Sequence, residues 1–312
     1  MLTLIINSSY SIPMIYKYNN DEKLDFWTPA KIKKAEHLKT RNIGFKTRNT
    51  KTIKNTIDSS KYTKSMPPLE KKYVLINNTI IEATNVNQIQ AYPIGLLIIR
   101  NHAGELFTCT ASVINTGNGN IGLTAAHCLF NNATKTYYGD IVFSPGFNNG
   151  QVGPLGAIRV VQKIVTDEFL NNNNDQFDWG MVKFNFNIGG HPLQAFTGAL
   201  GWEFNVGNDT PIPTTILGYP DEGDLQNCPN DGLTLCGWHG ITHLVDDYYV
   251  IPDLEIGKGA SGSPCMINYD PNTNLGTLYS DYASFDGIEE EALLPFYNPI
   301  LFQALLGEII GF

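Results

Sequence analysis

The stretch GKGASGSP, residues 257–264, sets small residues around two serines and ends on a proline. Glycine at this density lets the backbone turn sharply and leaves amide N–H groups uncovered by side chains. Such a loop suits an oxyanion hole beside a nucleophilic Ser261, although Gly/Ser/Pro clusters are also common in ordinary turns. A catalytic role for this stretch therefore requires that the rest of the chain supply a base and a carboxylate.

Two further stretches supply these partners. A nucleophilic serine needs a base that takes its proton, and a carboxylate that holds the base in the right tautomer. His127 lies in the apolar stretch LTAAHC, near the end of an expected strand, where it would point into a cleft. Asp178 stands in DQFDWGMVKF just before another expected strand, with Asp175 as the nearest competitor. The chain order His, Asp, Ser is one of the known orders of the serine triad.

The pattern of apolar residues from about Ala91 onward predicts an all-β fold. Short runs such as IGLLIIR, FTCTASVI, AIRVVQKIV and TTILGYP alternate with Asn/Gly/Pro/Asp clusters such as NTGNGN and NYDPNTN. This spacing is typical of an antiparallel sandwich or barrel. Only the end, NPILFQALLGEII, has apolar residues three and four apart after a proline suited to a first turn, which predicts a helix.

These stretches together resemble a known family. LTAAHC around His127, DWGMVKF from Asp178 and GASGSP around Ser261 resemble the three signatures of trypsin-like serine peptidases of the chymotrypsin fold. The form with SGSP and an upstream GYP at 218–220 is similar to the microbial, glutamyl-endopeptidase-like branch. The resemblance implies two antiparallel β-barrels, at about 91–205 and 206–298, and a C-terminal helix at about 299–310.

The resemblance also implies roles for the residues that carry it. Ser261 would attack the scissile carbonyl of a protein or peptide substrate, His127 would accept and return the proton, and Asp178 would orient His127. The N–H groups of Gly259 and Ser261 would form the oxyanion hole. This chemistry needs no cofactor and no metal.

The chain departs from the family pattern at the nucleophile and around it. Digestive members carry an aspartate before the nucleophile, where this chain has Ala260, so a trypsinogen-like switch is not expected. Glutamate-selective members use a histidine after the nucleophile, and none follows Ser261. Glu255 stands where trypsins have the pocket-floor aspartate and Asp281 near the expected pocket wall, so we expect a basic residue at the cleavage site.

Charge divides the chain into two parts. Residues 1–90 hold 15 Lys/Arg and 7 Asp/Glu, net +8, whereas residues 91–312 hold 6 and 23, net −17. The basic part lacks the aromatic interleaving of nucleic-acid binders, and we expect a pro-segment that sits against the acidic peptidase domain or is flexible. An activating protease would then create a mature N-terminus between Tyr73 and Ala91.

All five cysteines lie after residue 90. The family resemblance implies a Cys109–Cys128 disulfide that pins the histidine loop. Cys228 could pair with Cys236, or Cys236 with Cys265, and the sequence leaves this open. Cys228, Cys236, His239 and His243 were considered as a metal site, but their spacing is the reverse of that in zinc fingers, so no metal site is expected there.

Other functions compete with the peptidase interpretation. An α/β-hydrolase needs its histidine after the serine, and none follows Ser261, which rejects that class. A protease-fold protein that binds a partner without cleaving it is the remaining alternative. We expect a secreted monomer, although the start MLTLII is too short for a standard signal peptide, and we expect neither membrane nor nucleic-acid partners.

Overall fold

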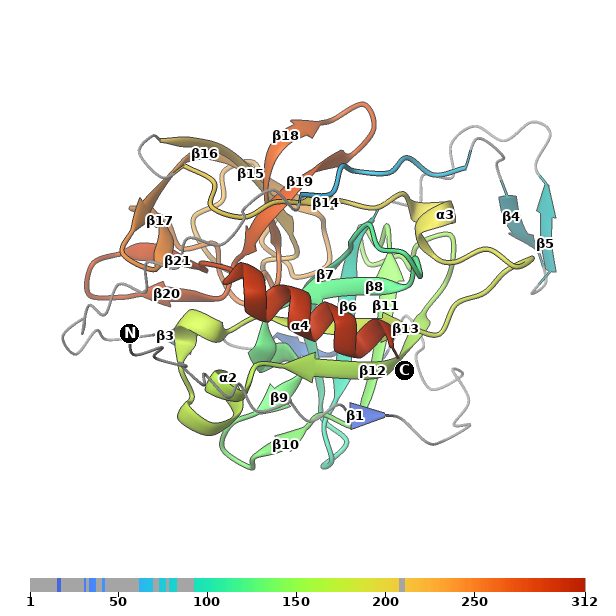
Figure 1. The fold of residues 1–312 in the computed structure, drawn as a ribbon, viewed down its shortest axis with the longest axis horizontal. Helices are drawn as coiled ribbons and strands as arrows, with labels where there is room; N and C mark the ends of the chain where they lie inside the picture. The colour runs from blue at the N-terminus through green and yellow to red at the C-terminus, as the bar shows by residue number, and fades with distance from the viewer. Residues whose placement is uncertain are drawn as a thin grey trace, which may run out of the picture.

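The computed structural model describes residues 16–17, 31, 34–37, 41–42, 62–69, 73–76, 79–82, 93–207 and 211–311. The apolar runs of the sequence form strands, and the predicted all-β fold with a C-terminal helix is confirmed (Figure 1). None of the helices in the described residues is long and apolar enough to cross a membrane.

The first barrel is a closed antiparallel sheet. Its order is β12-β11-β6-β7-β8-β13, and β13 pairs again with β12. Stacked Phe143 and Phe184 rings, 4.7 Å apart, fill part of its core. Its strands are β6 (Ile94–Arg100), β7 (Leu106–Val113), β8 (Ile121–Thr124), β11 (Asp140–Pro145), β12 (Ile158–Val165) and β13 (Gly180–Phe184).

Short elements lie in the loops between the barrel strands and, in the case of α3, in the connection from β13 to the second sheet. Some of them carry the candidate site residues described below. They are η2 (Ala126–Cys128), β9 (Phe130–Asn131), β10 (Thr136–Tyr137), α2 (Asp167–Asn172), η3 (Asp175–Phe177) and α3 (Gln194–Thr197).

The second sheet has the order β14-β19-β18-β15-β16-β17-β21-β20. β3 (Arg41–Asn42) adds a ninth strand beyond β20, and the pairs are antiparallel except β14 with β19 and β20 with β3. In the described residues no strand ladder closes it, but the Ser280 hydroxyl on β19 donates to the Pro295 carbonyl of β21 at 2.6 Å. The strands are β14 (Gly201–Trp202), β15 (Ile212–Gly218), β16 (Cys236–Val245), β17 (Tyr248–Pro252), β18 (Pro264–Asp270), β19 (Leu275–Asp281), β20 (Ser284–Asp286) and β21 (Glu291–Pro295).

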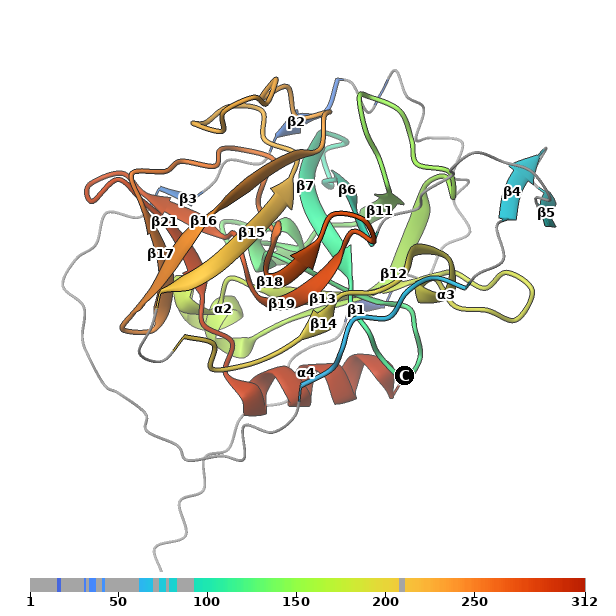
Figure 2. The same ribbon diagram turned by 90° about the horizontal axis from the view of Figure 1, so that it is seen from above.

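The C-terminal helix α4 (Pro299–Ile310) runs along one side of the molecule (Figure 2). Asn298 caps it by accepting hydrogen bonds from the N–H groups of the second and third helical residues, and Pro299 occupies the first turn. Phe302 is fully buried against Trp179 and Trp202, at ring distances of 5.8 and 5.2 Å. Because Trp179 directly follows Asp178, this helix packs behind a candidate site residue.

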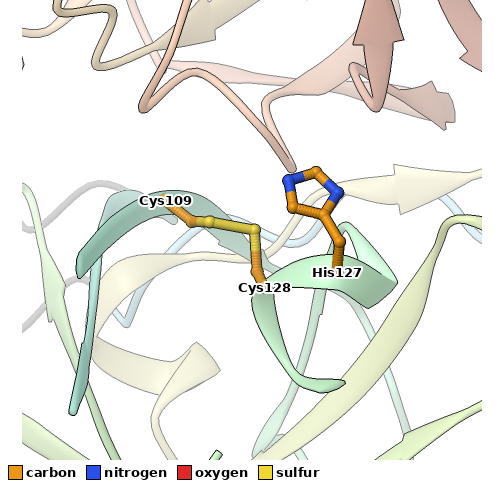
Figure 3. A group of neighbouring side chains, drawn as sticks. All are labelled: Cys109, His127 and Cys128. Carbon is orange, nitrogen blue, oxygen red and sulfur yellow. A yellow bond between two sulfur atoms is a disulfide. The ribbon is translucent and has the colours of Figure 1, made fainter. Parts of the chain in front are cut away.

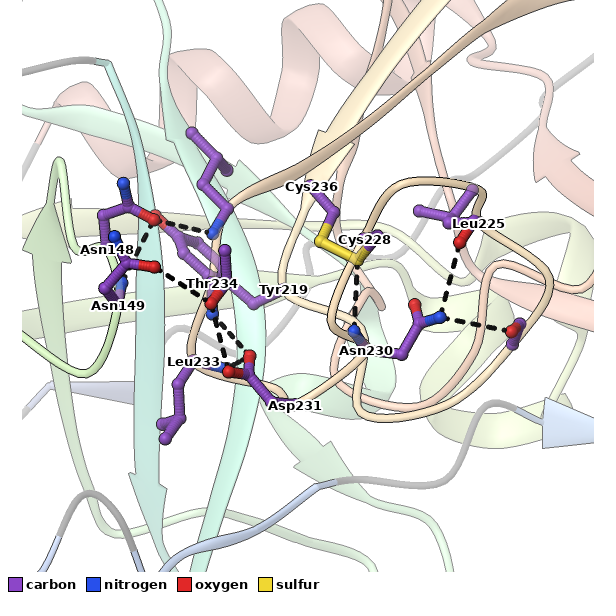
Figure 4. The surroundings of a disulfide bond; sticks show 12 residues. Asn148, Asn149, Tyr219, Leu225, Cys228, Asn230, Asp231, Leu233, Thr234 and Cys236 are labelled. Carbon is purple, nitrogen blue, oxygen red and sulfur yellow. Dashed lines mark hydrogen bonds between the residues drawn. A yellow bond between two sulfur atoms is a disulfide. The ribbon is translucent and has the colours of Figure 1, made fainter.

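A disulfide-bonded loop joins the two halves. Cys228 pairs with Cys236 (Figure 4), which settles the pairing left open by the sequence. Cys265 is a buried free thiol. The side-chain oxygen of Asn148, in the first half, accepts from the Leu235 N–H at 3.0 Å. This contact thus holds together loops from both halves.

Parts of the N-terminal segment attach to the barrels upstream of the expected boundary at residue 90. Residues 62–69 pair with the connection before β14: Thr63 with Trp202, and Met66 with Ala199. Other N-terminal strands are β1 (Tyr16–Lys17), β2 (Glu36–His37) and β3 (Arg41–Asn42), which pair with barrel strands, and the separate hairpin of β4 (Tyr73–Ile76) and β5 (Thr79–Glu82). The predicted mature terminus between Tyr73 and Ala91 falls largely on residues outside the described ones.

Gly307 offers a test of the helix assignment. It lies inside α4, and a Cβ built there meets no atom within 4 Å. Gly307→Ala should therefore raise the free energy of unfolding by about 0.5–1 kcal/mol, because alanine has less backbone entropy to lose. Urea denaturation checks this, and an unchanged or lower stability would contradict a regular helix at this position.

Candidate active site

His127 lies on η2, immediately after β8. The Cys109–Cys128 disulfide joins β7 to this short helix, as the family resemblance implies. Figure 3 shows the imidazole ring beside this disulfide, extending toward a loop from the C-terminal part of the chain. His127 is buried, with 9% of its surface exposed.

Asp178 fixes His127 through two contacts. One carboxylate oxygen, Oδ1, accepts the His127 backbone N–H at 2.8 Å, and the other, Oδ2, lies 2.9 Å from Nδ1. Asp178 is fully buried at the end of η3, where its own N–H donates to the Asp175 carbonyl. Of the two aspartates that the sequence offered, Asp178 is therefore the one that contacts the histidine.

Ser261 lies on the loop between β17 and β18, packed against the histidine segment. Its carbonyl accepts the Thr110 N–H at 2.8 Å, and the disulfide sulfur of Cys128, which has no proton to donate, lies 3.9 Å from the same oxygen. Ser261 Oγ and His127 Nε2 are both buried, and neither has a hydrogen-bond partner in the part of the chain that the structure describes. A hydroxyl and an unoccupied basic nitrogen therefore remain for chemistry.

The turn around Ser261 requires glycine. Gly262 has φ +83°, and a Cβ there would lie 2.2 Å from Thr124 Oγ1 and 2.3 Å from the Thr110 carbonyl. Gly259 also has a positive φ, +80°. The residues of GASGSP are thus small because β7 and β8 pack directly against this stretch.

Hydrogen bonds hold the loop in this form. Ser263 donates from both N–H and Oγ to the Ala260 carbonyl, at 2.9 and 2.6 Å. Thr110 Oγ1 donates to the Gly259 carbonyl at 3.1 Å. Within the described residues, the N–H groups of Gly259 and Ser261 donate to no protein acceptor, so both are available to an oxyanion. Thr110 was missed by sequence reasoning, because nothing local marks a threonine that bonds a loop 149 residues away.

The two predicted pocket carboxylates occupy different surroundings. Asp281 is fully buried, and its Oδ1 accepts from the Tyr297 hydroxyl at 2.6 Å. Glu255 is half-buried, and burial together with the charges of Glu222 and Asp224 raises its pKa. No interaction joins Asp281 to Glu255 among the described residues, so a shared pocket stays a prediction.

Burial raises the pKa of Asp281 well above its usual range, and the nearby charge of Asp178 raises it further, against the lowering effect of the Tyr297 hydrogen bond. In the unfolded state, Asp281 releases its proton above the ordinary pKa of an aspartate, about 3.9. In the folded state it keeps this proton to higher pH. The contribution of Asp281 to the free energy of unfolding is therefore full below the pKa of the unfolded state, and it decreases as the pH rises toward the pKa of the folded state.

Asp281→Asn should remove this loss. The asparagine oxygen can still accept from Tyr297 but cannot ionise, so the free energy of unfolding should fall less between pH 5 and pH 8 than in the unsubstituted protein. Urea denaturation at the two pH values measures this. Equal pH dependence in both proteins would mean that Asp281 is ionised in the fold.

Cys109, His127 and Cys128 bring three metal-ligating atoms within 4.8 Å of one another (Figure 3). Both sulfurs are already used in the disulfide, which leaves the imidazole as the one donor of the three. The alternative zinc set has lost its sulfurs in the same way, because Cys228 and Cys236 are bonded to each other. These two groups therefore do not fit a metal ion.

Comparisons with known proteins agree with this architecture. No family model matches the sequence. A glutamyl endopeptidase of Bacillus licheniformis is 22% identical over 195 residues, 62% of this chain and 55% of the relative, so the chain spans about half the length of that relative.

Three solved structures share the fold. The protease Anisep from Arthrobacter nicotinovorans has a TM-score of 0.58 at 20% identity, covering 72% of this chain and 98% of its own. The thermostable serine protease AL20 from an extremophilic microorganism has a TM-score of 0.56 at 19% identity, and the match covers 70% of this chain and 97% of AL20. A Glu endopeptidase has a TM-score of 0.55 at 18% identity, and the match covers 72% of this chain and 95% of that protein. The chain therefore has the chymotrypsin-like fold of serine peptidases, and the four similar proteins named here are proteases.

Proposed function

We propose that this protein is a serine endopeptidase that hydrolyses peptide bonds through His127, Asp178 and Ser261. The observation that carries the proposal is the double contact of Asp178 with His127, at 2.8 and 2.9 Å, beside a buried Ser261 hydroxyl. A carboxylate that accepts both the backbone N–H and Nδ1–H leaves Nε2 without a proton. That nitrogen is the one that a general base needs.

The reaction follows from these groups. Ser261 Oγ attacks the scissile carbonyl carbon while its proton passes to Nε2 of His127, and the carbonyl oxygen becomes an oxyanion. The N–H groups of Gly259 and Ser261 stabilise this charge. The C–N bond then breaks, the amine leaves with the proton from Nε2, and an acyl ester remains on Ser261. Water, deprotonated by His127, hydrolyses the ester and restores the serine.

The proposed setting is a secreted, monomeric enzyme made as a precursor and cut by an activating protease. Two disulfides are typical of an oxidising compartment. The basic residues 1–90 complement the acidic remainder of the chain.

The proposed cleavage preference is for basic residues, with Glu255 and Asp281 lining the pocket; Glu255 supplies the negative charge, because burial favours the neutral form of Asp281. Glu255 stands near Glu222 and Asp224, so negative charge gathers beside the loop that leads to Ser261. Lys258, which pairs with Glu222 at 2.7 Å, offsets part of it. The similar protein from Bacillus licheniformis is a glutamyl endopeptidase, and acidic preference is the competing outcome.

Labelling with a fluorophosphonate tests the function. The full chain is treated with the probe before and after limited digestion by a metalloprotease, which a chelator then stops. Ser261 should become labelled after the digestion, and Ser261→Ala should be labelled in neither sample. Cleavage of a mixed peptide library, read by mass spectrometry, then gives the preference: cuts after Lys/Arg support the Glu255 pocket, and cuts after Glu discard it. Folded protein that is never labelled would favour a non-catalytic binding protein.

A further inference from the structure

Thr110 lies on the part of β7 that faces the nucleophile loop. β6 pairs with β7 along nearly its whole length, whereas β8 pairs with it at Ser112 and Val113. Before Ser112, this second edge of β7 is therefore open to a different partner. At Thr110 the partner is the loop, because the Thr110 N–H donates to the Ser261 carbonyl at 2.8 Å. Thr110 is fully buried at this contact.

The side chain of Thr110 makes a second contact with the same loop. Its Oγ1 donates to the Gly259 carbonyl at 3.1 Å. The backbone N–H of Tyr219 donates to this hydroxyl oxygen at 3.2 Å, and an N–H can only donate. The single hydroxyl proton is therefore left for Gly259, and Tyr219 keeps the hydroxyl turned toward it. One residue of the first half thus binds both residues whose N–H groups form the proposed oxyanion hole.

Thr110 is itself supported by two anchored neighbours. Tyr219 is fully buried, its hydroxyl donates to the Phe147 carbonyl at 2.6 Å, and the two rings meet edge to face at 5.8 Å. Cys109, which precedes Thr110 in the chain, is bonded to Cys128 of the histidine segment (Figure 3). A residue can position catalytic groups only if its own conformation is fixed in this way.

The loop does not hold the oxyanion hole through its own backbone preferences. Gly259 has φ +80° and no Cβ, so the peptide groups on either side of it rotate at low cost. The carbonyl of Lys258 is fixed by the Asp221 N–H at 2.8 Å, and the carbonyl of residue 260 is fixed within the loop. The Gly259 carbonyl between them is held by the Thr110 hydroxyl. The N–H groups of residues 259 and 261 lie on the peptide groups directly before and after this one, so its rotation would move both.

We infer that Thr110 is a positioning residue for the oxyanion hole: its N–H and its hydroxyl hold Ser261 and Gly259 so that their N–H groups converge on the carbonyl oxygen of the substrate. This inference rests on the proposed peptidase function and adds what prepares that site for the transition state. Donors that stabilise an oxyanion are effective when they are oriented before the charge develops. The contact with Thr110 supplies this orientation in a chain that has Ala260 before the nucleophile.

Thr110→Val tests the inference, because valine has nearly the shape of threonine but cannot donate to the Gly259 carbonyl. In the full chain after the limited digestion described above, kcat for peptide hydrolysis should fall about 10- to 100-fold, somewhat less than the loss of a whole oxyanion-hole donor causes. KM should change less than about 3-fold, because the oxyanion exists in the transition state and not in the bound substrate. Thr110→Ser keeps the hydroxyl and should restore kcat to within about 3-fold of the unsubstituted protein.

A peptide boronate gives a readout that a loss of stability alone would not change. Boron accepts an electron pair from Ser261 Oγ, whose proton passes to His127, and one hydroxyl of the tetrahedral boronate takes the place of the oxyanion. The inhibition constant of the boronate should therefore rise in Thr110→Val by about the factor by which kcat falls. The affinity for an uncleaved peptide, measured with Ser261→Ala in the presence and absence of Thr110→Val, should stay within about 3-fold.

Thr242→Val is the matched control. Thr242 is as fully buried as Thr110, and its hydroxyl forms a hydrogen bond with the Tyr279 hydroxyl at 2.7 Å in the interior of the second half. Urea denaturation should show a similar loss of stability in both valine variants. Only Thr110→Val should change kcat and boronate binding. If Thr110→Val does not fold, Thr110→Ala takes its place, because alanine also lacks the hydroxyl and adds no atom.

The outcomes separate this inference from the proposed function. A Thr110→Val protein that keeps its kcat, or whose kcat falls without weaker boronate binding, overturns the positioning role and leaves the peptidase function intact. Equal losses of kcat in Thr110→Val and Thr242→Val overturn it as well. A loss confined to Thr110→Val, matched by the boronate and reversed in Thr110→Ser, supports it. Folded, unsubstituted protein that neither hydrolyses peptides nor reacts with a fluorophosphonate overturns the peptidase function and, with it, the role of Thr110.

Discussion

Ser261→Ala should lower kcat/KM for peptide hydrolysis by about 10⁶-fold, the order of loss that removal of a serine nucleophile causes. Alanine has no oxygen to form the acyl ester, while the rest of the loop stays as it is. The Ser261 Oγ makes no hydrogen bond within the described residues, so its removal leaves no protein group unpaired. The variant should therefore be as stable as the unsubstituted protein. Hydrolysis of a chromogenic peptide, and urea denaturation, measure the two effects.

Ser263→Ala is the matched control for this prediction. Ser263 lies in the same turn and is equally buried, but its Oγ is already engaged with the Ala260 carbonyl at 2.6 Å. Its backbone N–H donates to the same oxygen and remains after the substitution. We expect a loss of activity below about 10-fold and a loss of stability of about 1 kcal/mol. A Ser261→Ala protein that retains more activity than Ser263→Ala would remove Ser261 from the mechanism.

The features that the sequence predicted well are those with a local cause. Apolar residues three and four apart after Pro299 predict a helix, and α4 begins at Pro299. The turn residues between apolar runs predict the strands of both halves. Ser261 and His127 stand out because the backbone around each must be small or tightly turned, and such constraints leave a mark on neighbouring residues.

Features that depend on distant partners could not be predicted in the same way. Asp178 and Asp175 both precede the same strand, and only the folded geometry shows which one contacts His127. The attachment of Thr63 and Met66 to the connection before β14 is mediated by backbone groups that every residue has. Strand pairs as short as β2 and β3 likewise carry no periodicity, so charge alone suggested that the segment binds the peptidase domain.

The same geometry predicts an effect of Asp178→Asn that goes beyond loss of charge. The backbone N–H of His127 can only donate a hydrogen bond. The oxygen of the new amide must therefore face it, in the place of Oδ1. The NH₂ group then takes the place of Oδ2 and donates to Nδ1 of the ring. An imidazole that accepts at Nδ1 carries its proton on Nε2, and this tautomer cannot accept the proton of Ser261.

We therefore expect Asp178→Asn to lower kcat/KM by about 10⁴-fold while the fold is kept. Nitrogen NMR of the labelled imidazole should show the proton moved from Nδ1 to Nε2, which a merely structural role for Asp178 would not produce. Asp175→Asn is the control: its backbone carbonyl, which accepts from the Asp178 N–H, is unchanged by the substitution, so activity should stay within about 3-fold and the tautomer should not change. If both substitutions lower activity equally without a change of tautomer, the aspartates act on the stability of this loop, and His127 has another partner in catalysis.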